Sequence, residues 1–211
     1  MKLIVKRDEP EGLRNHREQK NEDWQPDFDD LPSAPKIEIH GSLLREQGYI
    51  CCYCNMQISA SSSHVEHFRP RSRFPEKSLE YGNLHASCQR QIPRKTPLKC
   101  GMKKGDWFDE RLIISPLQAD CETRFRFTVD GAIYPSNEND AAARETIVRL
   151  GLDQYELRRR RSESIEAIIS AIESYDANDI ERLIYEFERR DGMERFTPFC
   201  VALIYILKSH L

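Results

Sequence analysis

Long apolar runs are missing from this sequence. Nowhere in its 211 residues does a stretch approach the roughly 18 consecutive apolar residues that a membrane-spanning helix needs. The opening, Met1 to Glu11, carries charges where a signal peptide has an apolar segment. These absences argue against a membrane protein or an exported one, and we expect a cytoplasmic protein without a membrane partner.

An excess of positive charge is also missing. Lys and Arg number 32 against 35 Asp and Glu, which gives a net charge of -3. A protein that binds nucleic acid alone is usually basic, so any nucleic acid here would need a local basic patch or a second protein. The sequence also lacks a G-x-x-x-x-G-K-[ST] loop, internal repeats and low-complexity segments. A P-loop ATPase is therefore excluded.

Cysteines, by contrast, are frequent. The seven of them, in a chain without an export signal, favour metal ligation or free thiols over disulfides. Cys51 and Cys54 have the two-residue spacer of a zinc knuckle, whereas eleven residues separate Cys88 from Cys100. Zinc prefers four tetrahedral ligands, so we expect these two pairs to hold one structural zinc ion rather than to be buried free thiols. The remaining three are expected to be ordinary thiols: Cys52, Cys121 and Cys200.

The first half of the chain mixes a polar segment with short elements. The 39% hydrophobic fraction suffices for a core in one domain or two small ones. After a short apolar opening, residues 8–36 are polar and acidic with scattered prolines, and Trp24 and Phe28 are the only large anchors there. An extended N-terminal arm over residues 1–36 is therefore predicted. The elements expected next are a helix over Lys36 to Gln47, a strand over His64 to Phe68, and a helix starting over Leu84 to Gln91 that Pro93 and Pro97 interrupt.

The second half is more regular. Residues 111–136 alternate apolar and polar side chains around Asp130-Gly131, which predicts a β-hairpin. Residues 137–211 form a helical C-terminal region. The helices expected there are Ala141 to Leu150, ending at Gly151; one capped by Asp153 and running through Ile172; Ala177 to Arg190; and Phe196 to Leu211.

Catalytic residue types lie inside the cysteine framework. Glu66 and His67 are adjacent, and hydrolysis of a phosphodiester needs a base for water and a cation for the phosphate charge. Adjacent residues on a strand point to opposite faces. A bend or bulge is therefore needed for both to share one site, or the carboxylate acts indirectly.

Together these residues resemble the HNH nuclease family. Glu66-His67-x-x-Pro70 is similar to its Asp-His-x-x-Pro signature, Asn83 to its central asparagine, and Lys104 to the lysine of its C-x-x-x-K ending. More narrowly, the chain resembles the PtuB-type HNH proteins of Septu and retron-linked anti-phage systems. That likeness extends to the segments I-S-P-L, R-F-R-F-T-V-D-G-A-I and T-I-V-R-L-G-L-D.

The resemblance implies an α+β fold in which residues 37–110 form a zinc-stapled ββα-metal core. His67 would activate water, Glu66 would bind or position Mg²⁺ or Mn²⁺, and Asn83 would hold the hairpin and orient the base. Gly101 departs from the family pattern, which has His or Asn after the last cysteine. Its ligand would then come from another residue, and the candidates are His85, Asp106 and Asp109.

The resemblance also implies partners. An ABC-type, PtuA-like ATPase is expected, sometimes with a reverse transcriptase and its DNA product. Basic residues near His67 are candidates for binding phosphates of DNA or RNA: Arg69, Arg71, Arg73, Lys103 and Lys104, with Arg90, Arg94, Lys95 and Lys99 further out. The run Arg158 to Arg161 is interpreted as a solvated helix face. The alternative function is a zinc-stabilised adaptor that binds nucleic acid or the ATPase without cutting.

Overall fold

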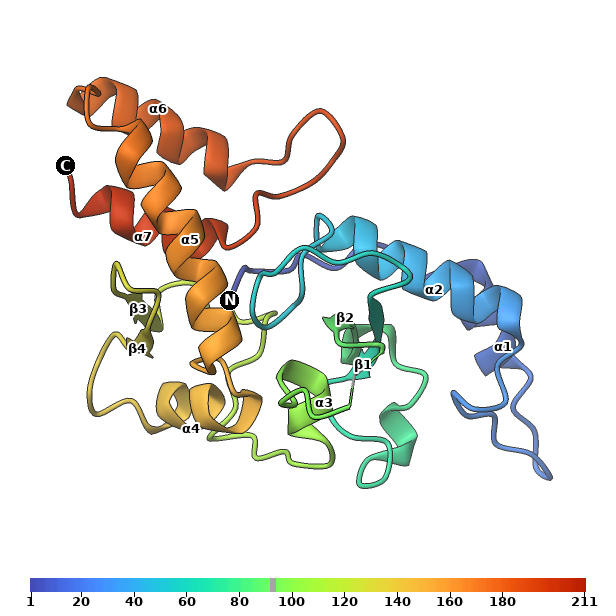
Figure 1. Cartoon of the computed structure of the whole chain (residues 1–211). Helices are drawn as coiled ribbons and strands as arrows, with labels where there is room; N and C mark the ends of the chain where they lie inside the picture. Colours follow the sequence, from blue (N-terminus) through green and yellow to red (C-terminus); the bar gives the residue numbers. More distant parts are fainter. Residues whose placement is uncertain (92–93) are drawn as a thin grey trace.

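The structure is a computed structural model that describes residues 1–91 and 94–211, and its architecture is mixed α+β (Figure 1). Two small antiparallel sheets lie among α-helices. In Figure 1, α1 and α2 lie at one side, α5 to α7 at the other, and the first sheet with α3 lies between them. The Pro93 named above lies outside the described residues. No helix of the described chain combines the length and hydropathy needed to cross a membrane.

An extended N-terminal arm was predicted, but the segment is only partly extended. It contains α1 (Glu11–Glu18), whose Leu13 is buried beside α2 (Ser33–Glu46). With a single buried apolar residue in eight, α1 has too little periodicity to be recognised from sequence. Helix α2 begins earlier than expected because Pro32 precedes it and Pro35 lies in its first turn, where a missing N–H costs nothing.

The first residues are anchored through Glu46, a buried carboxylate at the end of α2. Lys6 Nζ contacts Glu46 at 3.2 Å and the Leu84 carbonyl at 2.6 Å. The backbone N–H of Arg7 and the hydroxyl of Tyr81 also donate to Glu46, at 2.9 and 2.8 Å. The chain start therefore packs against the centre of the molecule.

The central sheet consists of β1 (Ser63–His67) and β2 (Leu84–Cys88). They pair antiparallel, residue for residue, from Ser63 opposite Cys88 to His67 opposite Leu84, without a bulge. The helix predicted from Leu84 is wrong. All five residues of β2 are buried, and a strand covered on both faces shows no alternation to separate it from a helix.

Short helices surround this sheet. Two 3₁₀ helices, η1 (Pro75–Lys77) and η2 (Tyr81–Asn83), lie between the strands in sequence, and α3 (Cys100–Lys104) packs on β2 and α4. The loop between β2 and α3 is closed by the side chain of Gln89. Its amide donates to Pro97 O at 3.0 Å and accepts from Lys99 N at 2.7 Å, which returns the chain to the sheet.

The predicted hairpin is confirmed as β3 (Phe125–Phe127) paired with β4 (Ile133–Pro135). Gly131, at φ +78°, forms its turn, where a Cβ would collide with the carbonyl of Arg158. Helix α4 (Ala141–Leu150) has the predicted bounds. Gly151 ends it in the left-handed conformation that favours glycine.

The last three helices are α5 (Tyr155–Ala171), α6 (Ala177–Glu188) and α7 (Cys200–Lys208). Asp153 was predicted to cap α5, but Gln154 occupies that position, and Asp153 instead accepts from Ile133 N at 3.1 Å. The main buried cluster includes residues from Met1 through the cysteine knuckle to Ala202. It thus joins the N-terminal segment, the central sheet and the C-terminal region.

Candidate metal centre and catalytic cleft

Four cysteines converge beside the central sheet. Cys51 and Cys54 come from the knuckle after α2, Cys88 from the end of β2, and Cys100 from the start of α3. Their sulfurs all lie within 4.8 Å of one another, and Cys54 Sγ is 4.0 Å from Cys88 Sγ. Tetrahedral zinc with bonds of about 2.3 Å places sulfurs about 3.8 Å apart. The cluster therefore has the donor set and spacing to hold a metal ion.

The cluster is buried and polar. Cys51 Sγ accepts from the Cys88 amide at 3.4 Å and lies 3.9 Å from Ser87 Oγ. Burial raises the pKa of the Cys100 thiol, whereas for Cys51 the hydrogen bonds from neighbouring thiols outweigh burial and bring its pKa well below the usual range. A metal cation would supply the charge that holds several thiolates together. Three further buried thiols lie outside the cluster: Cys52, Cys121 and Cys200.

A cleft of about 540 Å³ lies beside β1. Its wall includes residues that the sequence singled out, namely Glu66, His67, Arg71, Lys104 and Asp106. It also includes residues that the sequence analysis did not assign: Asp27, Asp29, His64 and Ser78. Glu66 and His67 share this cleft without a bulge, because His67 is the last residue of β1.

Glu66 is buried, and its two oxygens have different partners. Oε1 accepts from Tyr53 OH at 3.2 Å and pairs with Lys104 Nζ at 3.0 Å. Oε2 lies 3.6 Å from His64 Nε2. Lys104 was predicted to bind phosphates at the surface, but its side chain is 1% exposed and also donates to the His67 carbonyl at 3.1 Å. Lys104 therefore positions β1 against α3.

Gly101 explains how the Glu66 carboxylate fits there. A Cβ at Gly101 would lie 2.7 Å from Glu66 Cδ and 3.1 Å from His64 Nε2. The missing side chain thus makes room for both groups. His64 and Glu66 are two residues apart on one strand and so share a face, a signal that could have identified His64 from sequence. Among the described residues, the buried Nδ1 of His64 has no hydrogen-bond partner.

His67 is held by neighbours from distant segments. Its Nε2 donates to the Ser78 carbonyl at 3.0 Å, because a carbonyl oxygen can only accept a hydrogen bond. The edge of the Phe28 ring packs on the imidazole with centroids 4.7 Å apart. Burial lowers the pKa of His67 to about 4, so the ring is neutral at pH 7 and Nδ1 remains a proton acceptor.

Asn83 holds the loop that follows β1. Its Oδ1 accepts from Arg69 N at 2.7 Å, and its Nδ2 donates to the carbonyls of Arg69 and Lys77, both at 3.0 Å. The polar contact on the imidazole of His67 comes from the Ser78 carbonyl rather than from Asn83. Asn83 therefore contacts the loop after β1, whereas the Ser78 carbonyl contacts the ring of His67.

The three residues predicted to replace a ligand at Gly101 lie in different places. Asp106 is exposed in the cleft wall, whereas Asp109 accepts from Arg111 N at 2.9 Å and caps a turn. His85 lies opposite Glu66 on β2, fully buried, and burial lowers its pKa. Among the described residues, the four cysteines are the only group of three or more Cys, His, Asp or Glu placed to share a metal ion, with sulfurs within 4.8 Å of one another. Glu66, His85 and Asp106 do not form one.

Three arginines around the cleft have partners within the chain. Arg69 pairs with Glu110 at 2.8 Å and Arg71 with Asp29 at 2.6 Å. Arg73 donates to the Phe108 carbonyl at 2.9 Å. Lys103 is exposed, and no described carboxylate lies within 4.0 Å of it.

Comparison with known proteins adds to this geometry. No protein-family model matches the chain. Over 156 residues the chain is 31% identical to the "Retron Vc95 putative HNH endonuclease" of Vibrio cholerae serotype O1 biovar El Tor, which covers 71% of this chain and 73% of that protein. The chain belongs to the HNH endonuclease family. In this HNH protein the cysteine cluster and the cleft share α3, because Cys100 faces the cluster while Gly101 and Lys104 line the cleft.

Proposed function

We propose that this HNH protein is a metal-dependent endonuclease that hydrolyses phosphodiester bonds in nucleic acid. Strands β1 and β2 with helix α3 would form the ββα-metal core, within a module spanning residues 37–110. The observation that carries the proposal is that a neutral, oriented His67 and the Glu66 carboxylate line the same cleft. A base and a carboxylate side by side are what metal-assisted hydrolysis of a phosphate requires.

Two metals are part of the proposal. The four cysteines would bind structural zinc, which contributes directly to folding free energy. Glu66 would hold a catalytic Mg²⁺ or Mn²⁺, and His64 and the exposed Asp106 lie in the same wall. Support comes from Glu66 Oε2, which neither Tyr53 nor Lys104 contacts and which lies 3.6 Å from His64 Nε2. When bound, that cation would neutralise charge on the phosphate.

The chain's own residues would supply the remaining chemistry. His67 Nδ1 would take the proton of the attacking water, with Nε2 fixed by the Ser78 carbonyl. Arg71 would orient the phosphate after exchanging its contact with Asp29. Asn83 would keep Arg69 and the loop behind it in place.

We place this activity in anti-phage defence. The retron in the name of the Vibrio relative supports that setting. The chain would act as the PtuB-type nuclease of a cytoplasmic system with an ABC-type, PtuA-like ATPase, and in some systems with a reverse transcriptase and its DNA. A net charge of -3 is consistent with a nuclease that works beside a second protein.

The test is a cleavage assay on single-stranded DNA, duplex DNA and RNA, with and without Mg²⁺ and the ATPase encoded beside the chain. His67→Ala should lower cleavage by about 100-fold or more, because the proton acceptor is lost. His210→Ala, at an exposed histidine, is the matched control and should cut normally. Undiminished cutting by His67→Ala would overturn the assignment.

A second function, binding without cleavage, is favoured by one observation. The Glu66 carboxylate is already paired with the buried Lys104, and Gly101 offers no ligand. A zinc-stabilised adaptor would bind nucleic acid or the ATPase equally well with and without His67. Cleavage that depends on a divalent ion separates the two functions.

A further inference from the structure

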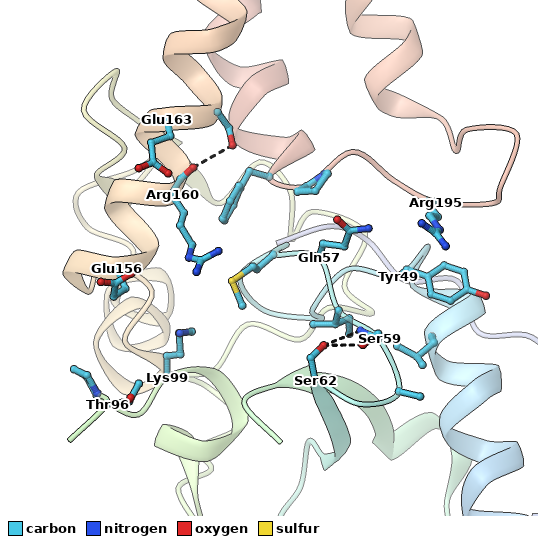
Figure 2. Close-up of a pocket in the computed structure, with 18 of the residues that line it drawn as sticks. Tyr49, Gln57, Ser59, Ser62, Thr96, Lys99, Glu156, Arg160, Glu163 and Arg195 are labelled. Atoms are coloured by element: carbon cyan, nitrogen blue, oxygen red, sulfur yellow. Dashed lines mark hydrogen bonds between the residues drawn. The ribbon is translucent and has the colours of Figure 1, made fainter. Parts of the chain in front are cut away.

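A second, larger cavity lies apart from the cleft. This groove of about 1290 Å³ is bounded by α2, the cysteine knuckle, α5 and the segment before α7. We call it the basic groove after the five cations in its wall, which are Arg45, Lys95, Lys99, Arg160 and Arg195. Figure 2 shows Arg160 extending from its helix into the groove, with Lys99 near it and Tyr49 and Arg195 across from them.

The wall of this groove carries five cations against two carboxylates. Within the part of the chain that the structure describes, no carboxylate lies within 4.0 Å of the cationic groups of these five residues. The wall also contains two glutamates, Glu156 and Glu163, but both pair with Arg159, which lies outside the groove. By contrast, Arg69 and Arg71 at the cleft are neutralised by carboxylates. A concave surface with unpaired cations attracts an anionic ligand.

The remaining wall residues suit nucleobases. Tyr49 is half-buried, and the Arg195 guanidinium lies 5.4 Å from its ring centroid. Met56 and Phe199 add apolar surface. Every base has a flat π face that stacks on aromatic rings or guanidinium planes, but only a single strand exposes those faces. A duplex would offer the groove its phosphates alone.

Tyr49 is fixed in place. Its backbone has φ +59°, a conformation that non-glycine residues rarely adopt. Two hydrogen bonds hold it: the Tyr49 N–H donates to Leu44 O at 2.9 Å, and the Tyr49 carbonyl accepts from Ile58 N at 2.8 Å. Such conformations persist where the surrounding structure imposes them, often at binding sites. The backbone from which the Tyr49 side chain reaches the groove wall is therefore held by the surrounding structure.

Strand β1 runs from the groove wall to the cleft. Ser62 lies in the groove wall and directly precedes this strand, whose last residue is His67. At a rise of about 3.3 Å per residue, these two positions are about 16 Å apart. That distance corresponds to roughly five nucleotides at a stacked rise of 3.4 Å per strand.

We propose that the basic groove binds a single strand of nucleic acid and leads it along β1 to the cleft. Phosphates would contact Arg160, Arg195 and the lysines, and bases would stack against Tyr49 and the Arg195 guanidinium. This inference names the substrate of the proposed nuclease and rests on that proposed function for its direction, but the binding itself does not require cleavage.

The test measures binding alone, in full-length His67→Ala protein, by fluorescence anisotropy with a labelled 20-nucleotide oligothymidine. Arg160→Glu with Arg195→Glu should weaken binding at least tenfold. The same change should make the slope of log K against log salt shallower by about 1.4, which is two phosphate contacts on a single strand. Arg182→Glu on α6 with Arg189→Glu directly after that helix makes the same charge change outside the groove and should stay within twofold.

A second pair of variants separates stacking from charge. Tyr49→Leu should weaken binding several-fold at an unchanged salt slope, and Tyr49→Phe should restore it. If the double reversal destabilises the chain, Arg160→Gln with Arg195→Gln gives the same comparison with a smaller change.

Three results would overturn the inference. The first is equal binding by the groove and control variants. The second is equal affinity for a duplex of the same length with the same dependence on Arg160 and Arg195. The third is loss of ATPase binding with unchanged oligonucleotide binding, which would make the groove a protein-binding surface. Absence of cleavage by the wild type would refute the proposed nuclease but leave these binding results valid.

Discussion

Gly101 shows how a missing side chain can shape a site. The backbone of α3 passes so close to β1 that the Glu66 carboxylate and the His64 ring occupy the space of its absent Cβ. Lys104 and Tyr53 contact Glu66 Oε1. The Glu66 side chain therefore cannot move away from Gly101 without losing buried polar contacts. Where the family pattern has a ligand after the last cysteine, the proposed cation site of this chain would take its ligands from β1.

Gly101→Ala should therefore lower the cleavage rate while the cysteine cluster still binds its metal. Displacing Glu66 by a fraction of an ångström to 1 Å should lower Mg²⁺-dependent cleavage by about 10- to 100-fold. Cysteine-bound metal should be unchanged. Gly82→Ala is the control, since a Cβ there meets no atom within 4 Å. Equal cleavage rates for the two variants, measured at saturating Mg²⁺, would show that Glu66 needs no such room.

The sequence identified the central pair of the candidate site but not its supports. Glu66 and His67 are adjacent, and their types suffice to suggest the chemistry. Ser78 and Phe28 contact His67 only because the loop after β1 and the N-terminal segment fold back over the strand. A backbone carbonyl is present at every residue and a phenyl ring is common in cores, so neither the Ser78 carbonyl nor the Phe28 ring can be assigned to a site from sequence. Lys104 was misplaced because burial of a lysine depends on a partner that lies 38 positions away, Glu66.

Among the elements, those with local signals were predicted well. Helix α4 has a capping aspartate, regular periodicity and Gly151 at its end, and the β3–β4 hairpin has a turn glycine. Strand β2 and helix α1 were not recognised, because their conformations follow from tertiary contacts. Asn83, at the end of η2, was identified by its neighbours in the motif, but its bonds to Arg69 and Lys77 depend on the folded loop.

The cysteine cluster is where the knuckle, β2 and α3 meet. Cys51→Ser should release the bound metal and remove several kcal/mol of folding free energy, because structural zinc sites contribute on the order of 10 kcal/mol. Metal content by mass spectrometry and unfolding in urea would measure both effects. Cys52→Ser, at an adjacent and equally buried thiol outside the cluster, should keep the metal. A metal-free Cys51→Ser protein as stable as Cys52→Ser would refute a structural metal.

In the whole molecule, charge is distributed unevenly rather than in excess. The net charge of -3 conceals a groove with five cations that have no carboxylate partner among the residues that the structure describes. The acidic N-terminal segment reaches the cleft through Asp27 and Asp29. The sequence showed the composition but could not show this separation. Arg160 belongs to a run interpreted as a solvated face, and only the packing of α5 beside the knuckle turns it toward the groove.

Stability should depend on pH through His67. Its pKa falls from the ordinary 6.5 to about 4 in the folded chain because burial disfavours the charged ring. Between these values the unfolded chain binds a proton that the folded chain does not, so folding stability is fully present above pH 6.5 and falls as the pH drops toward 4. The whole change corresponds to about 3 kcal/mol.

His67→Gln isolates this contribution, since other titrating groups, including the cysteine thiols, are common to both proteins. Without added divalent ions, urea unfolding of the wild type should lose about 3 kcal/mol more between pH 7 and pH 4 than that of His67→Gln. The difference between the two curves should be flat above pH 6.5, where His67 is neutral in both states. Parallel curves over the whole range would mean that the folded chain accepts the proton as readily as the unfolded one, and that His67 is not buried as a neutral base.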